Sequence, residues 1–230
     1  MYRIETNGTE RTIYGVLADY DLASWTGHLK NHYTPTSRQR TGTPPYMACE
    51  LLLGESDTHL YRHDLESLFY IMLLLCTRHI IAEETNGKTK KTTGRLVMRG
   101  ADPRMLPYAN WFDTSDYVTL GEKKQNFCMK LQRIELSPSF EAFRPWLQEI
   151  QLMFSHGFAY KEECIRQRKT LQFRGLPFEE AVPIDDETLG GKVSFPLFTG
   201  PTHQLTGKLK LIVRYPSKPS LPTNKISTEA

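Results

Sequence analysis

The strongest hydrophobic pattern in the chain lies in residues 61–76, which read YRHDLESLFYIMLLLC. Residues 68–76 are apolar on every face of a helix, whereas a surface helix has a single apolar stripe. The run is also much shorter than the roughly 20 apolar residues of a membrane span. We therefore predict a helix that is buried on all sides, with Asp64 and Glu66 in its first turn, where carboxylates interact favourably with the helix dipole.

Three further helices are predicted in the second half of the chain, at residues 117–134, 139–155 and 160–173. The first directs Phe127, Leu131 and Ile134 toward the core. The second has Ser139 as a candidate N-cap and Pro145 within its first turn, where proline is tolerated. The third is more polar. Aromatic residues at these spacings are typical of a protein core, so the helices indicate packing rather than a ligand site.

A β-hairpin is predicted at the beginning of the chain. Residues 1–4 and 11–17 have the composition of strands, and Asn7-Gly8 lies between them. Asn-Gly is the strongest short hairpin signal, because both residues tolerate positive φ. A lone hairpin is only marginally stable in water, so this start has the character of the second half of a larger structure.

Polar segments separate and follow these elements. Residues 25–40 lack periodicity and predict a long exposed loop, which is usually functional or disordered. Residues 78–103 are polar with mixed charge, and they predict an exposed insertion rather than a nucleic-acid-binding patch. Residues 201–230 contain several prolines and lysines and predict a basic, flexible tail.

The composition is that of a folded protein without a strong overall charge. Hydrophobic residues make up 39% of the 230 residues, which is enough for a core. The net charge is +3, which gives no global electrostatic reason to expect nucleic acid as a partner. Residues 207–230 contain five basic residues and one acidic residue, so the tail is basic and the body is nearly neutral.

The sequence predicts an intracellular protein of the cytoplasm or the nucleus. The four cysteines form no C-x-x-C pair, and we expect all of them to be reduced. No apolar segment typical of a signal peptide follows Met1. Since no membrane span is predicted either, a membrane is not an expected partner.

Two carboxylates directly follow the second predicted strand. Asp19 and Asp21 lie where the chain leaves a sheet, a position from which their oxygens can coordinate a hard cation. A turn in which the Asp side chains cap backbone donors explains the same pattern. Two histidine pairs with helical spacing lack the further ligand of a zinc site, which favours surface histidines.

Three motifs follow one another in a specific order: D-Y-D-L-A at residues 19–23, G-T-P-P-Y-M-A-C-E at 42–50, and H-D-L-E-S-L-F-Y at 63–70. This order resembles the activation segment and central helix of a protein kinase, and more narrowly the fungal-type protein kinase family. The clear resemblance covers residues 1–76, and a weaker one reaches residues 188–191. It implies an α+β, mainly α fold: a protein-kinase-like C-lobe with an N-terminal β-hairpin.

The resemblance implies a domain organisation and roles for single residues. A partial kinase-like C-lobe would occupy residues 1–200, and the tail would occupy residues 201–230. Asp19 would be the aspartate that holds Mg²⁺ on the phosphates of ATP, and Thr43 would lie in the peptide-docking turn. Thr36, Ser37 and Thr41 are possible phosphorylation sites, because Arg38 and Arg40 nearby could pair with a phosphate. Exposed Ser and Thr beside Arg are common, however, so the pattern favours an unmodified surface.

The resemblance also implies structural roles. Glu50 would be the glutamate of an A-P-E motif, in which Cys49 replaces proline, and it would pair with a buried arginine. Arg144 and Arg166 are both candidates for that arginine. Asp64, at the head of the central helix, would fix the backbone of the catalytic loop through hydrogen bonds.

Several parts of the kinase pattern are missing from the sequence. No H-R-D-x-x-x-x-N motif occurs, and no Gly-rich phosphate loop or V-A-I-K lysine precedes Asp19. Met1-Tyr2-Arg3 matches the end of the strand that follows the catalytic loop in the family, so we expect the chain to begin shortly after the missing Asn. The chain alone is therefore expected to be inactive.

Two functions follow from these observations. In the first, the chain is part of a Ser/Thr protein kinase, a transferase that moves the γ-phosphate of ATP to protein hydroxyls with Mg²⁺. In the alternative, it is a non-catalytic, pseudokinase-like module that binds or scaffolds another protein. Both functions predict a protein substrate or a protein partner.

Overall fold

In the computed structural model of the chain, the residues described are 2–7, 10–15, 42–56, 58–85, 92–113, 115–177 and 183–200. Backbone contacts divide the chain into two units, Met1–Gln39 and Arg40–Ala230. The described residues of the first unit form a hairpin, in which β1 (Tyr2–Asn7) pairs antiparallel with β2 (Glu10–Gly15). The predicted N-terminal hairpin is therefore confirmed.

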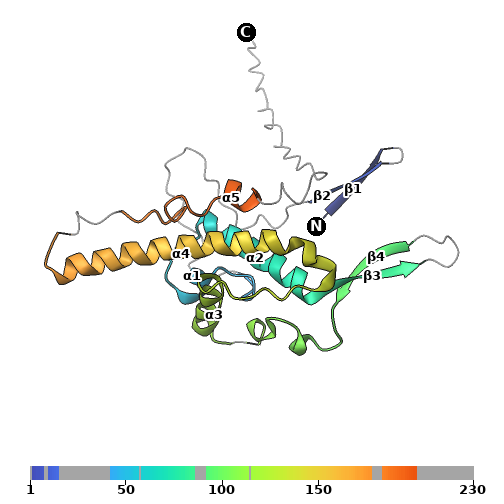
Figure 1. Ribbon diagram of the computed structural model, residues 1–230, viewed down its shortest axis with the longest axis horizontal. Coiled ribbons are helices and arrows are strands. Elements are labelled where there is room, and N and C mark those ends of the chain that lie inside the picture. The colour runs from blue at the N-terminus through green and yellow to red at the C-terminus, as the bar shows by residue number, and fades with distance from the viewer. Residues whose placement is uncertain are drawn as a thin grey trace, which may run out of the picture. The chain divides into compact units, whose positions relative to one another are not determined.

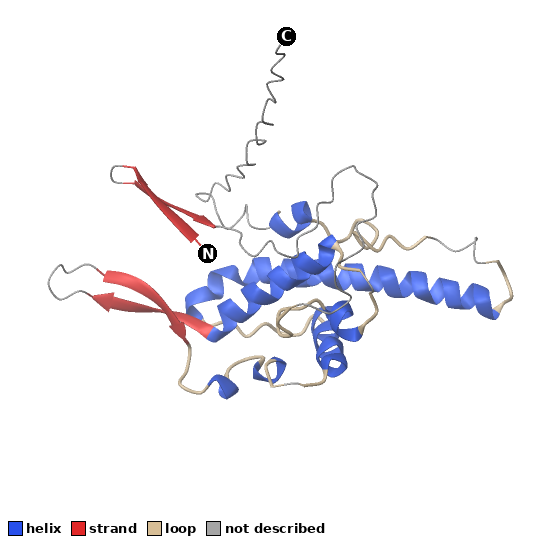
Figure 2. Ribbon diagram, turned by 180° about the vertical axis from the view of Figure 1, so that it is seen from behind, coloured by secondary structure: helices blue, strands red, loops and turns tan. Residues whose placement is uncertain are grey.

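The second unit is mainly helical (Figures 1 and 2). Its described α-helices are α1 (Cys49–Leu53), α2 (Tyr61–Arg78), α3 (Tyr117–Met129), α4 (Arg144–Phe173) and α5 (Phe195–Thr199). Short 3₁₀ helices lie at Pro103–Met105, Ala109–Trp111 and Pro138–Phe143. An antiparallel hairpin consists of β3 (His79–Thr85) and β4 (Thr92–Met98). The prediction of an α+β, mainly α fold is confirmed.

α2 lies against the core, but it is buried on only part of its circumference. Leu65, Phe69 and Leu73 face the core and are at most 4% exposed. On another side of the helix, Leu68 and Ile71 are 39% and 47% exposed. The predicted helix is confirmed, but its burial on all sides is wrong, because the described segments leave this face open to solvent.

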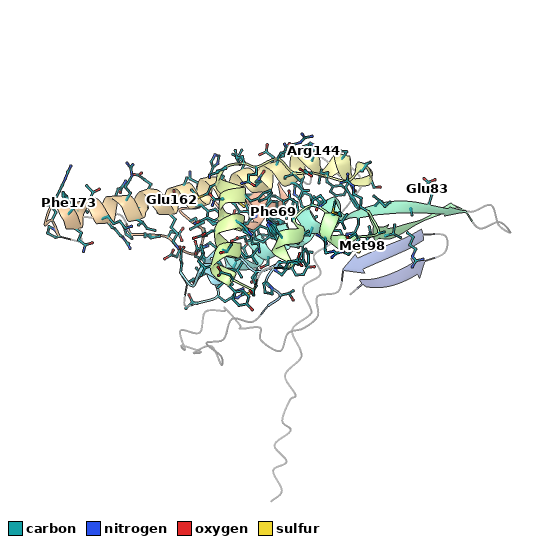
Figure 3. The ribbon with its side chains drawn as sticks, turned by 90° about the horizontal axis from the view of Figure 1, so that it is seen from below. Phe69, Glu83, Met98, Arg144, Glu162 and Phe173 are labelled. Atoms are coloured by element: carbon teal, nitrogen blue, oxygen red, sulfur yellow. The ribbon has the colours of Figure 1, made fainter. Side chains whose placement is uncertain are left out.

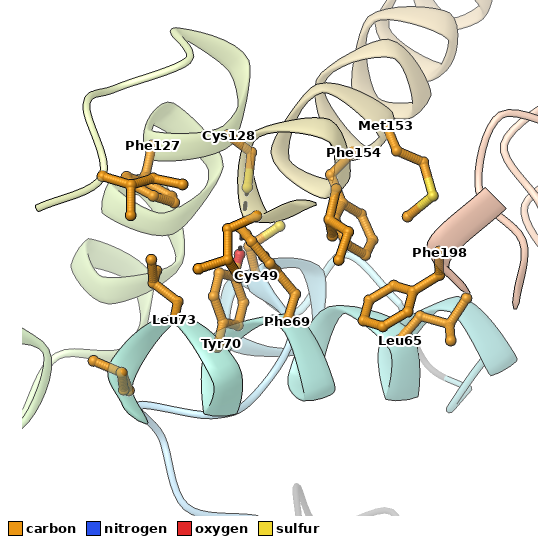
Figure 4. Close-up of a cluster of buried hydrophobic side chains, with 14 of the residues drawn as sticks. Cys49, Leu65, Phe69, Tyr70, Leu73, Phe127, Cys128, Met153, Phe154 and Phe198 are labelled. Carbon is orange, nitrogen blue, oxygen red and sulfur yellow. Dashed lines mark hydrogen bonds between the residues drawn. The ribbon is translucent and has the colours of Figure 1, made fainter. Parts of the chain in front are cut away.

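Aromatic side chains from α2, α3 and α4 form the centre of the core (Figure 4). The ring centroid of Phe69 lies 6.4 Å from that of Phe127 and 5.8 Å from that of Phe154. Tyr70 meets Trp111 edge-on at 5.4 Å between centroids. Burial of one large apolar side chain contributes about 1.5–3 kcal/mol, so these contacts hold α3 and α4 against α2.

α4 is continuous across the two helices predicted at residues 139–155 and 160–173. Gly157 lies between those ranges and contacts the closing segment, which we define as residues 183–194. A Cβ atom on Gly157 would lie 2.8 Å from both Leu189 Cδ1 and Val193 Cγ2, so only glycine allows this approach. Pro145 occupies the first turn of the helix, as predicted.

α3 ends earlier than the sequence pattern indicates. Its last residue is Met129, because Leu131 has a φ of 45°, a left-handed conformation that does not continue an α-helix. The Leu131 side chain is 47% exposed, so its predicted core position is wrong. Phe127 and Ile134 are buried, as predicted.

The β3–β4 hairpin lies in the segment predicted as an exposed insertion, where no strand was expected. Its register runs from His79 opposite Met98 to Thr85 opposite Thr92. The apolar runs in these strands are only a few residues long, and the charges around them obscure the pattern in the sequence. Figure 3 shows the hairpin projecting away from the core around Phe69.

Candidate functional site

The sequence motifs point to residues 42–50, here called the docking segment. Its backbone turns twice: Tyr46 N–H donates to Thr43 O at 2.9 Å, and Met47 N–H donates to Pro44 O at 3.2 Å. Thr43 is exposed near one end of the segment, and Glu50 is buried at the other. Two predicted site residues thus lie in one short segment, where Thr43 is exposed and Glu50 is buried.

Glu50 belongs to a group of charged side chains, here called the Glu50 cluster: Glu50, Arg62, His63, Lys161 and Asp186. Glu50 Oε2 accepts a hydrogen bond from Arg62 Nη2 and lies 3.1 Å from Lys161 Nζ. Arg62 Nε donates to Asp186 O at 2.5 Å, and Lys161 Nζ lies 3.4 Å from Asp186 Oδ1. The cluster joins α1, α2, α4 and the closing segment at one point.

His63 faces the carboxylate of Glu50 from the first turn of α2. Leu60 N–H donates to His63 Nδ1 at 3.1 Å, so a neutral ring carries its proton on Nε2, which lies 3.6 Å from Glu50 Oε2. Burial alone would raise the pKa of Glu50, but His63, Arg62 and Lys161 outweigh it and lower that pKa to about 2. Glu50 is therefore ionised at neutral pH.

The arginine partner of Glu50 is Arg62, and the two predicted candidates are wrong. Arg144 and Arg166 each pair instead with a glutamate three residues earlier in the chain. Arg62 follows Glu50 by 12 residues and lies at the polar end of an apolar helix. This position could have identified Arg62 as the partner from the sequence. An arginine in the first turn of a core helix can reach a buried carboxylate while the rest of the helix packs in the core.

A second buried group, here called the Lys124 cluster, consists of Lys124, Glu66, Tyr70, Cys49 and Cys128. Lys124 Nζ, from α3, donates to Pro44 O at 3.3 Å and to Met47 O. It also lies 3.9 Å from the ring centroid of Tyr70, a position in which an aromatic ring attracts a cation. Lys124 thus holds the middle of the docking segment. Sequence reasoning missed it, although Lys124 follows Leu120 by four residues and precedes Phe127 by three, a spacing that places it on the core face of α3.

Glu66 holds the end of the docking segment where α1 begins. Its Oε1 accepts hydrogen bonds from Cys49 N–H at 2.8 Å and from Tyr70 OH at 2.6 Å. Cys49 is the first residue of α1, and the N-cap Ala48 has no side-chain hydrogen bond. Glu66 therefore satisfies one of the N–H groups that a helix leaves unpaired at its start.

Burial changes the ionisation of the Lys124 cluster. It lowers the pKa of Lys124 to about 7, although Glu66 acts in the opposite direction. Burial, with Glu66 nearby, raises the pKa of Cys49 and Cys128, so both remain neutral thiols at neutral pH. Lys124 titrates near neutral pH and keeps N–H donors for its two carbonyl partners in either state.

The two clusters fix the docking segment while its exposed end stays accessible. Charged groups from α2, α3 and α4 bind its carbonyl, N–H and carboxylate groups, whereas Thr43 faces solvent. The backbone of the segment is thus held by groups from three helices, and one of its ends is exposed. The buried thiols and the buried amine are out of reach of a substrate, so we assign them a structural role.

The remaining predicted residues lie elsewhere. Asp64 is exposed and accepts a hydrogen bond from His59 Nε2 at 2.7 Å, which raises the pKa of His59. Its role toward a catalytic loop stays a prediction. Asp19 and the three candidate phosphorylation sites lie outside the described residues. Within the described ranges, no group of three or more His, Cys, Asp or Glu side chains is arranged to hold a metal ion.

Residues 4–76 match the family model of the fungal protein kinases, a partial match in this chain of 230 residues. The matched range includes Asp19, the docking segment and most of α2, so the family resemblance of this part is confirmed and indicates a kinase-like function. No curated protein and no solved structure matches the chain. Among the helices in the described part, none combines the length and apolar character needed to cross a bilayer.

Proposed function

We propose that this chain is the substrate-docking part of a fungal-type protein kinase with a protein-kinase-like C-lobe fold. In its complete form, such an enzyme transfers the γ-phosphate of ATP to Ser or Thr hydroxyls of a protein. The observation that carries the proposal is the overlap between the matched range 4–76 and the docking segment, which buried charges hold at its middle and at its end.

The docking segment supports this function by its construction. An extended substrate must meet a backbone surface that does not move, because a displacement of about 1 Å can cost 100-fold in rate. The Glu50 and Lys124 clusters provide that rigidity from inside the fold, and Thr43 marks the accessible end. Protein hydroxyls are accordingly the substrate class that we assign to the complete enzyme.

Asp19 is the residue that we propose for nucleotide binding. It would hold Mg²⁺, and the ion neutralises charge on the phosphates of ATP when it is bound. A carboxylate suits this hard cation. The sequence has no H-R-D-x-x-x-x-N motif to orient the attacking hydroxyl, so we propose that these 230 residues alone do not transfer phosphate. An intracellular location would supply both ATP and protein substrates.

The alternative function is a non-catalytic module that binds a protein partner. It is favoured by the same docking segment, whose anchoring groups do not depend on a catalytic loop. In that case the segment would bind a partner without modifying it.

The test measures Mg²⁺·ATP binding and phosphate transfer with the purified chain and with Asp19→Asn. Calorimetric binding that is lost in Asp19→Asn, without transfer to a mixed Ser/Thr peptide library, supports the kinase-type proposal. Binding that is unchanged in Asp19→Asn would contradict the role proposed for Asp19, and binding of a protein partner without nucleotide favours the non-catalytic module. Mg²⁺-dependent transfer by the chain that Asp19→Asn abolishes would overturn the proposal that these residues alone are inactive.

A further inference from the structure

The β3–β4 hairpin has two outer edges, and the hydrogen-bond register identifies the groups on each. Arg99 N–H donates to Arg78 O at 2.8 Å, directly beside the first ladder pair, His79 and Met98. Bonded and non-bonded pairs alternate in an antiparallel ladder. The backbone groups of residues 79, 81 and 83 in β3, and of residues 94, 96 and 98 in β4, therefore point outward.

The outer edge of β3 is covered by two serines. Ile81 N–H donates to Ser139 Oγ at 3.0 Å, and the Ser137 hydroxyl donates to His79 O at 2.5 Å. Both bonds involve residues that the register places on the outside, which confirms the assignment of the edges. Two serine side chains at the start of the 3₁₀ helix Pro138–Phe143 thus provide hydrogen-bond partners for the outward backbone groups at the beginning of β3.

The outer edge of β4 is open in the described part of the chain. The outward N–H and C=O groups of Gly94, Leu96 and Met98 have no hydrogen-bond partner among the described residues. Beside this edge, Leu96 and Met98 are 48% and 43% exposed, and Ile81 is 48% exposed on the same face. Unpaired edge groups next to exposed apolar side chains form a template for another strand.

We propose that β4 pairs antiparallel with β4 of a second copy of this chain, with Leu96 on the two-fold axis. Charge disfavours the two neighbouring registers. An axis at residue 95 would place Arg95 opposite its own copy, and an axis at residue 97 would place Arg95 opposite Arg99. Like charges directly opposite each other destabilise a sheet. With the axis at Leu96, Arg95 faces Val97 of the other copy.

The same register joins the apolar side chains of the two copies. Leu96 faces Leu96, and Met98 of one copy faces Gly94 of the other. Ile81 already covers Gly94, since a Cβ atom there would lie 2.8 Å from Ile81 Cγ2, so Met98 of the second copy would contact Ile81. Two marginal hairpins become one four-stranded sheet with a continuous apolar face. Self-association through this edge goes beyond the kinase-type function and does not depend on it.

Disulfide trapping tests the register in the full chain. All four native cysteines are buried, so they give little background. Leu96→Cys should form a covalent dimer under mild oxidation, because directly opposed Cα atoms lie about 5.5 Å apart, within the range that a disulfide spans. Val97→Cys keeps Arg95 and Arg99, so the register that would bring the two introduced cysteines together stays unfavourable, and this variant should not cross-link. Absence of the Leu96→Cys dimer, or equal cross-linking by Leu96→Cys and Val97→Cys, would overturn the proposal.

Sedimentation equilibrium tests the association without a cross-link. The unmodified chain should show a concentration-dependent monomer–dimer equilibrium, and Leu96→Glu should shift it by at least 10-fold toward monomer, because two carboxylates would meet on the axis. Leu96→Val, which keeps an apolar side chain and the outward N–H, should retain the dimer. A dimer that persists in Leu96→Glu, or an unmodified chain that stays monomeric while β4 binds an unrelated extended peptide, contradicts the proposal.

Discussion

Glu50 accepts a hydrogen bond from Arg62, and each of these residues is 1% exposed. The pair connects the end of the docking segment to the first turn of α2, 12 residues later in the chain. Two charges of opposite sign tolerate such burial only together, because either one alone would have lost its water without compensation. The position of the docking segment therefore depends on both partners.

Glu50→Gln should destabilise the fold strongly. The amide leaves Arg62 and Lys161 without the carboxylate between them, and loss of one partner of a buried pair costs about 3–5 kcal/mol. Urea unfolding followed by circular dichroism measures this free energy. Glu141→Gln is the matched control, because Glu141 forms an ion pair with Arg144 at the surface, with 2.7 Å between Glu141 Oε1 and Arg144 Nη2. Equal losses for the two variants would contradict the assigned role of Glu50.

Acid should weaken the fold through the same carboxylate. The pKa of Glu50 is lowered from its ordinary value of 4.5 to about 2, so its contribution is complete above about pH 4.5 and is lost as the pH falls toward 2. The contribution is about 3 kcal/mol, a figure that follows from the size of the shift. Between pH 4.5 and 2, the free energy of unfolding should therefore fall more steeply with decreasing pH for the unmodified chain than for Glu50→Gln. Parallel curves for the two proteins would exclude this linkage.

The sequence was informative where the structure depends on local pattern. The α2 helix and the hairpin of the first unit both follow from short sequence patterns. The exposed face of α2 could not be foreseen, because an apolar run predicts burial without saying which segments cover it.

Contacts between distant residues were not predictable from the sequence. Lys124 binds Met47 O across 77 residues. Its spacing from Leu120 and Phe127 places it on the buried face of α3, but the backbone carbonyl that it meets cannot be read from that pattern. The close approach of Gly157 to Leu189 and Val193 likewise joins residues more than 30 positions apart. Such contacts are set by packing between elements, which a single sequence does not display.

Gly157→Ala should loosen the closing segment from α4. Alanine favours a helix over glycine by about 1 kcal/mol, but here its Cβ would lie 2.8 Å from Leu189 and Val193 side-chain atoms. Overpacking of this kind costs about 1–3 kcal/mol, so we expect a net loss of stability in urea unfolding. Gly100→Ala is the control, because its Cβ would meet Leu106 at an ordinary 3.6 Å. A stabilised Gly157→Ala protein would show that the closing segment moves aside without cost.

Lys124→Met should destabilise the fold and change its pH dependence. Methionine leaves the carbonyl groups of Pro44 and Met47 without their donor, and an unsatisfied buried polar group costs about 1–3 kcal/mol. Lys123→Met removes an exposed lysine from the next position of the same helix and should change little. Urea unfolding of both variants measures the difference.

The pH dependence separates the charge of Lys124 from its hydrogen bonds. Burial lowers the pKa of Lys124 from 10.5 to about 7, so between these values the unfolded chain binds the proton and the folded chain has released it. Stability therefore rises with pH in this window. From about pH 6.5 to 8.5, the unmodified chain should gain about 1–2 kcal/mol relative to Lys124→Met. The subtraction removes the opposing effect of Cys49 and Cys128, whose pKa values are raised in both proteins. A difference that does not vary with pH would mean that Glu66 and the Tyr70 ring keep Lys124 charged throughout.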